Sequence, residues 1–138
     1  MTWEERKREF YIRLLQHGLE LLPELSNDPL LLEAIEAAKY GDKKTLKSVE
    51  RKLQRRVEYT PSGQIFRGFI NILAQVKKGR TRQLSSALGV AFCECQYLLN
   101  EQGEMDAPSK AFGAESEFVG KLMHEIMDEP EVVSITKD

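Results

Sequence analysis

The sequence has few of the residues on which most catalytic and metal sites depend. Among 138 residues there are two histidines, His17 and His124, and neither has a second ligand at metal-binding spacing. His17 is expected at the surface or rim of a helix. No serine lies in a nucleophile-elbow motif, and no glycine-rich phosphate loop follows a strand-like segment. We therefore predict a non-enzyme without a catalytic residue, a cofactor or a metal site.

Long hydrophobic runs are also missing. No apolar run approaches the roughly 18–20 residues that a membrane span needs, and the first residues are charged rather than apolar as in a signal peptide. The chain is therefore predicted to be cytoplasmic, with no membrane partner. The two cysteines, Cys93 and Cys95, would point about 200° apart on a helix, which excludes a disulfide between them. We expect reduced thiols in a core helix.

Helix signals dominate what is present. Apolar residues recur at i, i+3 and i+4, and Asp28 and Asp42 are favourable N-cap residues. A proline or a glycine follows most of these patterns. The sequence predicts an all-α, single-domain bundle of about five to six helices over residues 1–130, with a flexible tail over 131–138. The expected helices cover about 2–22, 28–41, 42–57, 60–79, 81–103 and, after a loop containing Asp106 and Pro108, a sixth that ends near Asp128.

The fifth predicted helix is the best candidate for the centre of the bundle. Residues 82–101 carry a continuous apolar stripe, and the opposite side is also apolar. A helix that is apolar all round is buried on all sides, either within one chain or against a second subunit. Ile12 and Leu19 lie on a second face of the first helix. A homo-oligomer or a protein partner is therefore possible, through a predicted interface of Ile12, Leu19, Val90, Cys93 and Tyr97.

Several glycines lie inside the predicted helices. Each costs about 1 kcal/mol relative to alanine, so a compensating reason is expected. Gly113 and Gly120 are seven residues apart and share one face. Either another helix approaches closely there, or the sixth helix starts after Gly113.

Charge is distributed unevenly along the chain. The formal net charge is −2, but residues 42–82 hold twelve cations and three anions, whereas residues 83–138 carry a net charge of −8. The third predicted helix places its cations opposite an apolar stripe. Like charges at i, i+4 cost a few tenths of a kcal/mol per pair, which an anionic partner would offset. The predicted nucleic-acid-binding residues are Lys43, Lys44, Lys47, Arg51, Arg55, Lys77, Lys78, Arg80 and Arg82.

Three interpretations of this basic block remain open. It is a solvated face, or it is covered by the acidic C-terminal third (Glu115, Glu117, Glu125, Asp128, Glu129 and Glu131), or it binds nucleic acid or an acidic protein surface. The leading hypothesis is a non-enzymatic helical binding protein, as a small subunit of a nucleoprotein assembly that contacts the nucleic-acid backbone. The alternatives are a protein-interaction or immunity-type helical module that uses an apolar surface, and a self-assembling homodimer.

The segment Thr60-Pro-Ser-Gly-Gln-Ile-Phe-Arg67 resembles the start of a helix in small helical subunits of type III CRISPR effector complexes. Those subunits are non-catalytic and line a nucleoprotein filament. The resemblance ends within ten residues, so it implies no residue roles here.

Overall fold

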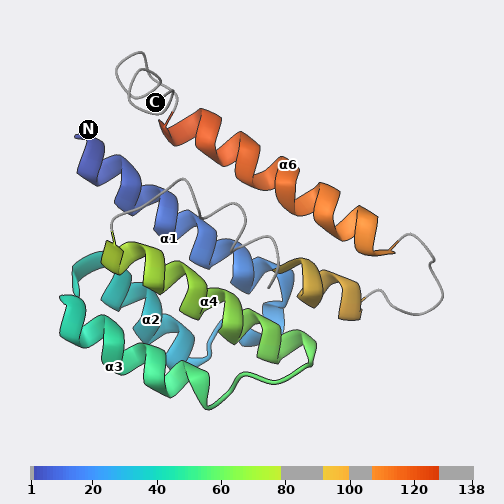
Figure 1. The fold of residues 1–138 in the computed structure, drawn as a ribbon, viewed down its shortest axis with the longest axis horizontal. Coiled ribbons are helices and arrows are strands. Elements are labelled where there is room, and N and C mark those ends of the chain that lie inside the picture. The colour runs from blue at the N-terminus through green and yellow to red at the C-terminus, as the bar shows by residue number, and fades with distance from the viewer. Residues whose placement is uncertain (1, 79–91, 100–106, 128–138) are drawn as a thin grey trace.

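The computed structural model describes residues 2–78, 92–99 and 107–127, and all regular structure in these ranges is helical (Figure 1). The all-α bundle predicted from the sequence is therefore confirmed. The predicted tail over 131–138 lies outside the described residues, as do Val90, Arg80 and Arg82. The elements are α1 (Trp3–Leu21), a short 3₁₀ helix η1 (Pro23–Leu25), α2 (Pro29–Tyr40), α3 (Lys43–Gln54), α4 (Pro61–Lys78), a helical segment over 92–99, and α6 (Ala107–Met127).

Side chains at the predicted caps bind the first free N–H groups of the helices. The Asp28 carboxylate accepts a hydrogen bond from the Leu30 N–H at 3.0 Å, and Asp42 accepts one from the Thr45 N–H at 2.8 Å. These bonds satisfy backbone donors that have no partner within the helix. Both helix starts expected from the sequence are thus confirmed.

Two helix boundaries differ from the prediction. α3 ends at Gln54 rather than near Val57, with Arg55 as its C-cap in helical geometry. α6 already begins at Ala107, so Pro108 belongs to its first turn rather than to the preceding loop. Proline is tolerated there because the N–H that it lacks would have no acceptor within the helix.

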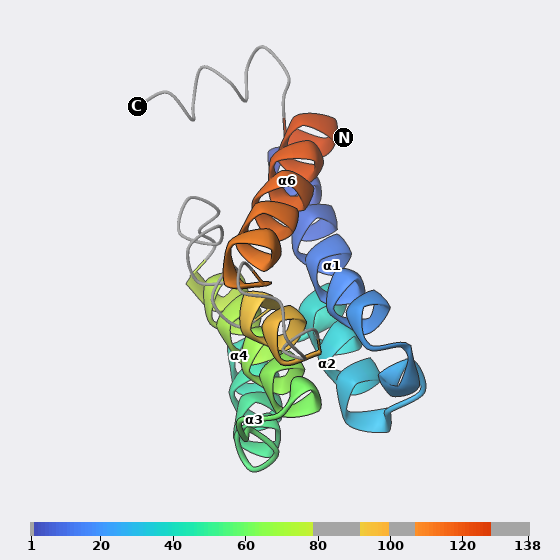
Figure 2. The same cartoon turned by 90° about the vertical axis from the view of Figure 1, so that its right-hand side faces the viewer.

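The helices pack around one core. α1 packs against α2, α4 and α6, and α3 packs against α2 and α4. Every one of α1 to α4 contributes completely buried side chains, with Phe92 and Cys95 from the 92–99 segment beside them. α3 and α6 lie on opposite sides of the bundle (Figures 1 and 2). No helix in the described parts of the chain combines the length and apolarity needed to cross a membrane.

The ring of Phe92 is packed against two helical glycines. A Cβ atom added to Gly68 would lie 2.3 Å from the Phe92 ring, and one added to Gly18 would lie 2.8 Å from it. α1 and α4 therefore leave just enough room for the aromatic side chain of the 92–99 segment. Gly120 behaves differently, because nothing lies within 4 Å of its would-be Cβ. A close approach of another helix at Gly120, the first of the two alternatives, is therefore wrong. The second alternative, a sixth helix that starts after Gly113, is also wrong, because Gly113 falls inside α6.

Candidate nucleic-acid interface

α3 has a buried side and a cationic side. Leu46, Val49 and Leu53 are buried, as predicted. The cations opposite them are all exposed, and none has an ion-pair partner within the described ranges. Four of them repeat at i, i+4 and thus form a line about 18 Å long, with steps of about 6 Å. We call this set the α3 cationic face: Lys43, Lys44, Lys47, Arg51 and Arg55.

The charged residues on the flanks of α3 bind its neighbours. The Lys52 ammonium lies 2.9 Å from the Glu33 carboxylate of α2, and Glu50 lies 2.7 Å from the Lys77 ammonium of α4. Lys77, one of the predicted nucleic-acid-binding cations, is therefore not free, because its charge is offset by Glu50. Lys78, one residue further, is exposed.

Arg56, just after α3, joins the end of this region to α2. Its guanidinium lies 2.8 Å from the Asp28 carboxylate and 4.1 Å from the centre of the Phe66 ring. Burial acts to raise the pKa of Asp28, but the bonds from Arg56 and from the first N–H groups of α2 outweigh it and hold this pKa below its usual value. The charge of Arg56 is thus offset by a partner within the fold, unlike the charges of the α3 cationic face.

The acidic residues of α6 bind partners away from α3. Glu125 lies 3.7 Å from Arg13 of α1, and Glu117 lies 3.1 Å from Lys121 of α6 itself. The remaining described carboxylate of the predicted acidic cover, Glu115, is buried between α1 and α6. Within the described residues the acidic third therefore does not cover the α3 cationic face. Asp128, Glu129 and Glu131 lie outside the description.

The described side chains of the predicted apolar interface are buried or half-buried. Ile12 is 6% exposed, so its place in a partner-binding surface is wrong: α1 has neighbours in α2, α4 and α6. Leu19 is partly buried and packs against the core. Cys93 and Tyr97 are half-buried. These side chains offer less exposed apolar area than the sequence pattern indicated.

A buried polar cluster joins α1, the 92–99 segment and α6. His17 Nε2 lies 2.9 Å and 3.1 Å from the two carboxylate oxygens of Glu115, and the Gln96 side-chain amide donates to the same carboxylate. The His17 ring stacks on Phe118, with centroids 3.7 Å apart. The expectation that His17 lies at the surface is wrong, because α6 covers that side of α1. His17 and Glu115 are 98 residues apart, so no local pattern could have revealed the pair.

The cysteines next to this cluster are poor nucleophiles. Burial, followed by the negative charge of Glu115, raises the pKa of the Cys95 thiol to about 11. The pKa of Cys93 is raised to about 11 by burial and by the charges of Glu115 and Glu94. A thiol is reactive as its thiolate, which is scarce at neutral pH under these conditions. Within the described residues, no three His, Cys, Asp or Glu side chains converge to hold a metal ion.

A Cys93→Ser variant, which retains only Cys95, tests this environment. At pH 8 we expect iodoacetamide to alkylate the native variant about a hundredfold more slowly than the urea-unfolded variant, because a rise in pKa from 9.0 to about 11 lowers the thiolate fraction by that factor. The rate is measured by mass spectrometry. Equal rates in the native and unfolded states would contradict this burial of Cys95.

Comparisons of the chain with protein-family models, with curated proteins and with solved structures give no match.

Proposed function

We propose that this chain is a non-enzymatic helical binding protein that contacts the phosphate backbone of nucleic acid through the α3 cationic face. The observation that carries the proposal is the exposure of five cations on one side of one helix without ion-pair partners in the described residues. The cations at i, i+4 on α3 repel each other, which destabilises the helix. An anionic partner bound to the α3 cationic face would offset this repulsion.

The spacing of these cations favours nucleic acid over an acidic protein surface. Lys43, Lys47, Arg51 and Arg55 lie in a line about 18 Å long. One strand of a nucleic acid carries a regular row of phosphates, so a row of cations of this length can contact several of them at once. α3 has no aromatic residue, so it is suited to phosphate contacts rather than to base stacking.

A salt titration tests the proposal. We expect the chain to bind generic duplex DNA and RNA, with the logarithm of the affinity for DNA falling against the logarithm of the salt concentration at a slope of about −4.5, or about −0.9 for each of five phosphate contacts. A double variant, Lys47→Gln with Arg51→Gln, should bind about sixtyfold more weakly at 0.1 M salt and reduce the slope by about 1.8. Fluorescence anisotropy of a labelled duplex measures both quantities.

The matched control removes two cations elsewhere. Arg13→Gln with Lys121→Gln changes the net charge by the same amount, but these residues already pair with Glu125 and Glu117 on the α6 side of the molecule. This control should bind as the unmodified chain does. If both double variants weaken binding equally, the α3 cationic face is not the interface. If no salt-sensitive binding occurs at low salt, the proposed function is wrong.

A further inference from the structure

A groove at the start of α3 extends the α3 cationic face towards α1. It has a volume of about 260 Å³ and lies between the first turns of α1, the end of α2, the start of α3 and the end of α4. Lys43 belongs to both features, since it is the first residue of α3 and also lines the groove. A nucleic-acid strand bound along the α3 cationic face would therefore reach the groove at the N-terminal end of α3.

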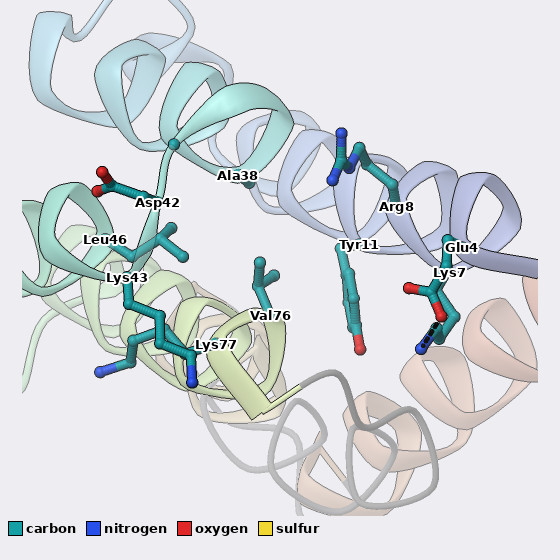
Figure 3. A pocket seen from close by; sticks show the side chains of 11 residues that line it. Glu4, Lys7, Arg8, Tyr11, Ala38, Asp42, Lys43, Leu46, Val76 and Lys77 are labelled. Carbon is teal, nitrogen blue, oxygen red and sulfur yellow. Dashed lines mark ion pairs between the residues drawn. The ribbon is translucent and has the colours of Figure 1, made fainter.

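The two unpaired cations of the groove lie on opposite walls. Lys7 pairs with Glu4 at 3.0 Å, and Lys77 pairs with Glu50 at 2.7 Å. The other two lining cations, Arg8 and Lys43, are exposed and have no ion-pair partner within the described residues. Figure 3 shows Lys43 and Lys77 on one side of the groove and Arg8 on the other.

The anions of the groove are already engaged. Glu4 is held by Lys7, and the Asp42 carboxylate accepts a hydrogen bond from the Thr45 N–H of α3. Tyr11 adds no negative charge at neutral pH, because its burial and the nearby Glu4 raise its pKa to about 12. Among the described residues, the groove has two cations without an ion pair, Arg8 and Lys43, against one such anion, Asp42. Its surplus charge is therefore positive, which favours phosphate groups at the two walls.

The floor of the groove is small and only partly apolar. Ala38, Leu46 and Val76 line it between the charged walls, beside the ring of Tyr11 (Figure 3). Its volume equals that of about nine water molecules at roughly 30 Å³ each, which is enough for one flat ring system but not for a base pair with its two backbones. Ala38 is 5% exposed and Leu46 is 3% exposed, so the groove offers a single unpaired base only a narrow apolar strip between its polar walls.

We propose that the groove takes one nucleotide of a single-stranded nucleic acid, with its base between the two walls and its flanking phosphates on Lys43 and Arg8. This inference rests on the proposed function and adds to it the class of nucleic acid. The strand would continue from the groove along Lys47 and Arg51. A duplex could still contact the α3 cationic face, but it could not use the groove, because its bases are paired and stacked.

The test compares Arg8→Gln with Arg13→Gln, a change on the same helix whose cation pairs with Glu125 instead. The probes are a labelled single-stranded DNA of about 15 nucleotides and a duplex of the same sequence. Arg8→Gln should weaken single-strand binding about fivefold at 0.1 M salt and reduce its salt slope by about 0.7, the value for one phosphate contact on a single strand. It should leave duplex binding unchanged, and Arg13→Gln should leave both unchanged.

Two results would overturn the inference. One is Arg8→Gln binding the single strand as the unmodified chain does. The other is an equal loss of affinity for the single strand and for the duplex, which would show that Arg8 acts through the overall positive charge of the surface and not through the groove. In either case Lys47→Gln with Arg51→Gln would still weaken binding if the proposed function holds. If that double variant also has no effect, the proposed function fails together with the inference.

Discussion

Replacement of Glu115 by alanine is expected to lower the free energy of unfolding by about 3–5 kcal/mol. Glu115 is 2% exposed, and its carboxylate accepts hydrogen bonds from His17 Nε2 and from the Gln96 amide. Truncation would leave the buried His17 ring and the partly buried Gln96 amide without this acceptor and would open a cavity between α1 and α6. Urea unfolding followed by circular dichroism measures the change.

The control for this prediction lies two residues further along the same helix. Glu117 is exposed, and within the described residues its ion-pair partner is Lys121, so Glu117→Ala should change stability by less than about 0.5 kcal/mol. Glu115→Gln retains one acceptor oxygen and should cost clearly less than Glu115→Ala. Below its unfolding temperature, Glu115→Ala should bind nucleic acid normally, because the cluster lies away from α3. Equal stabilities for the Glu115→Ala and Glu117→Ala variants would contradict the structural role of the cluster.

Gly68→Ala is the second large expected effect, and its sign is opposite to that of helix propensity. Alanine favours a helix over glycine by about 1 kcal/mol. At Gly68, however, the added methyl group would lie 2.3 Å from the Phe92 ring, which is completely buried and also rests against Gly18. The ring cannot retreat from α4 without meeting α1. We therefore expect a net loss of stability of about 2 kcal/mol, as for other overpacked cores.

Gly120→Ala provides the matched control. This residue also lies in a helix, but its added methyl group would have no neighbour within 4 Å, so the same substitution should stabilise the protein by up to about 1 kcal/mol. In the Gly68→Ala background, Phe92→Leu should recover part of the loss, because a smaller side chain makes room for the methyl group. Thermal unfolding of the single and double variants measures these differences. A stabilising Gly68→Ala would show that the ring is not held between the two glycines.

Predictions that depended on neighbouring residues along the chain agree well with the structure. Asp28 and Asp42 start α2 and α3 because a cap acts on N–H groups only two or three residues away. The buried and cationic sides of α3 follow from the 3.6-residue repeat alone. The same reasoning could not show that Lys77 is paired with Glu50, because the two residues belong to different helices whose packing the repeat does not specify.

The amino-acid sequence by itself determined that this chain is helical, where most of its described helices start, and that α3 carries cations opposite an apolar stripe, because caps and helical periodicity act over a few residues. Only the tertiary structure decided which charges remain free, that Ile12 and His17 are buried, and that Arg8 and Lys43 line one groove. These outcomes depend on which helices pack together. That choice is made by the summed packing of side chains far apart in the chain, such as His17 and Glu115, and no local pattern encodes it.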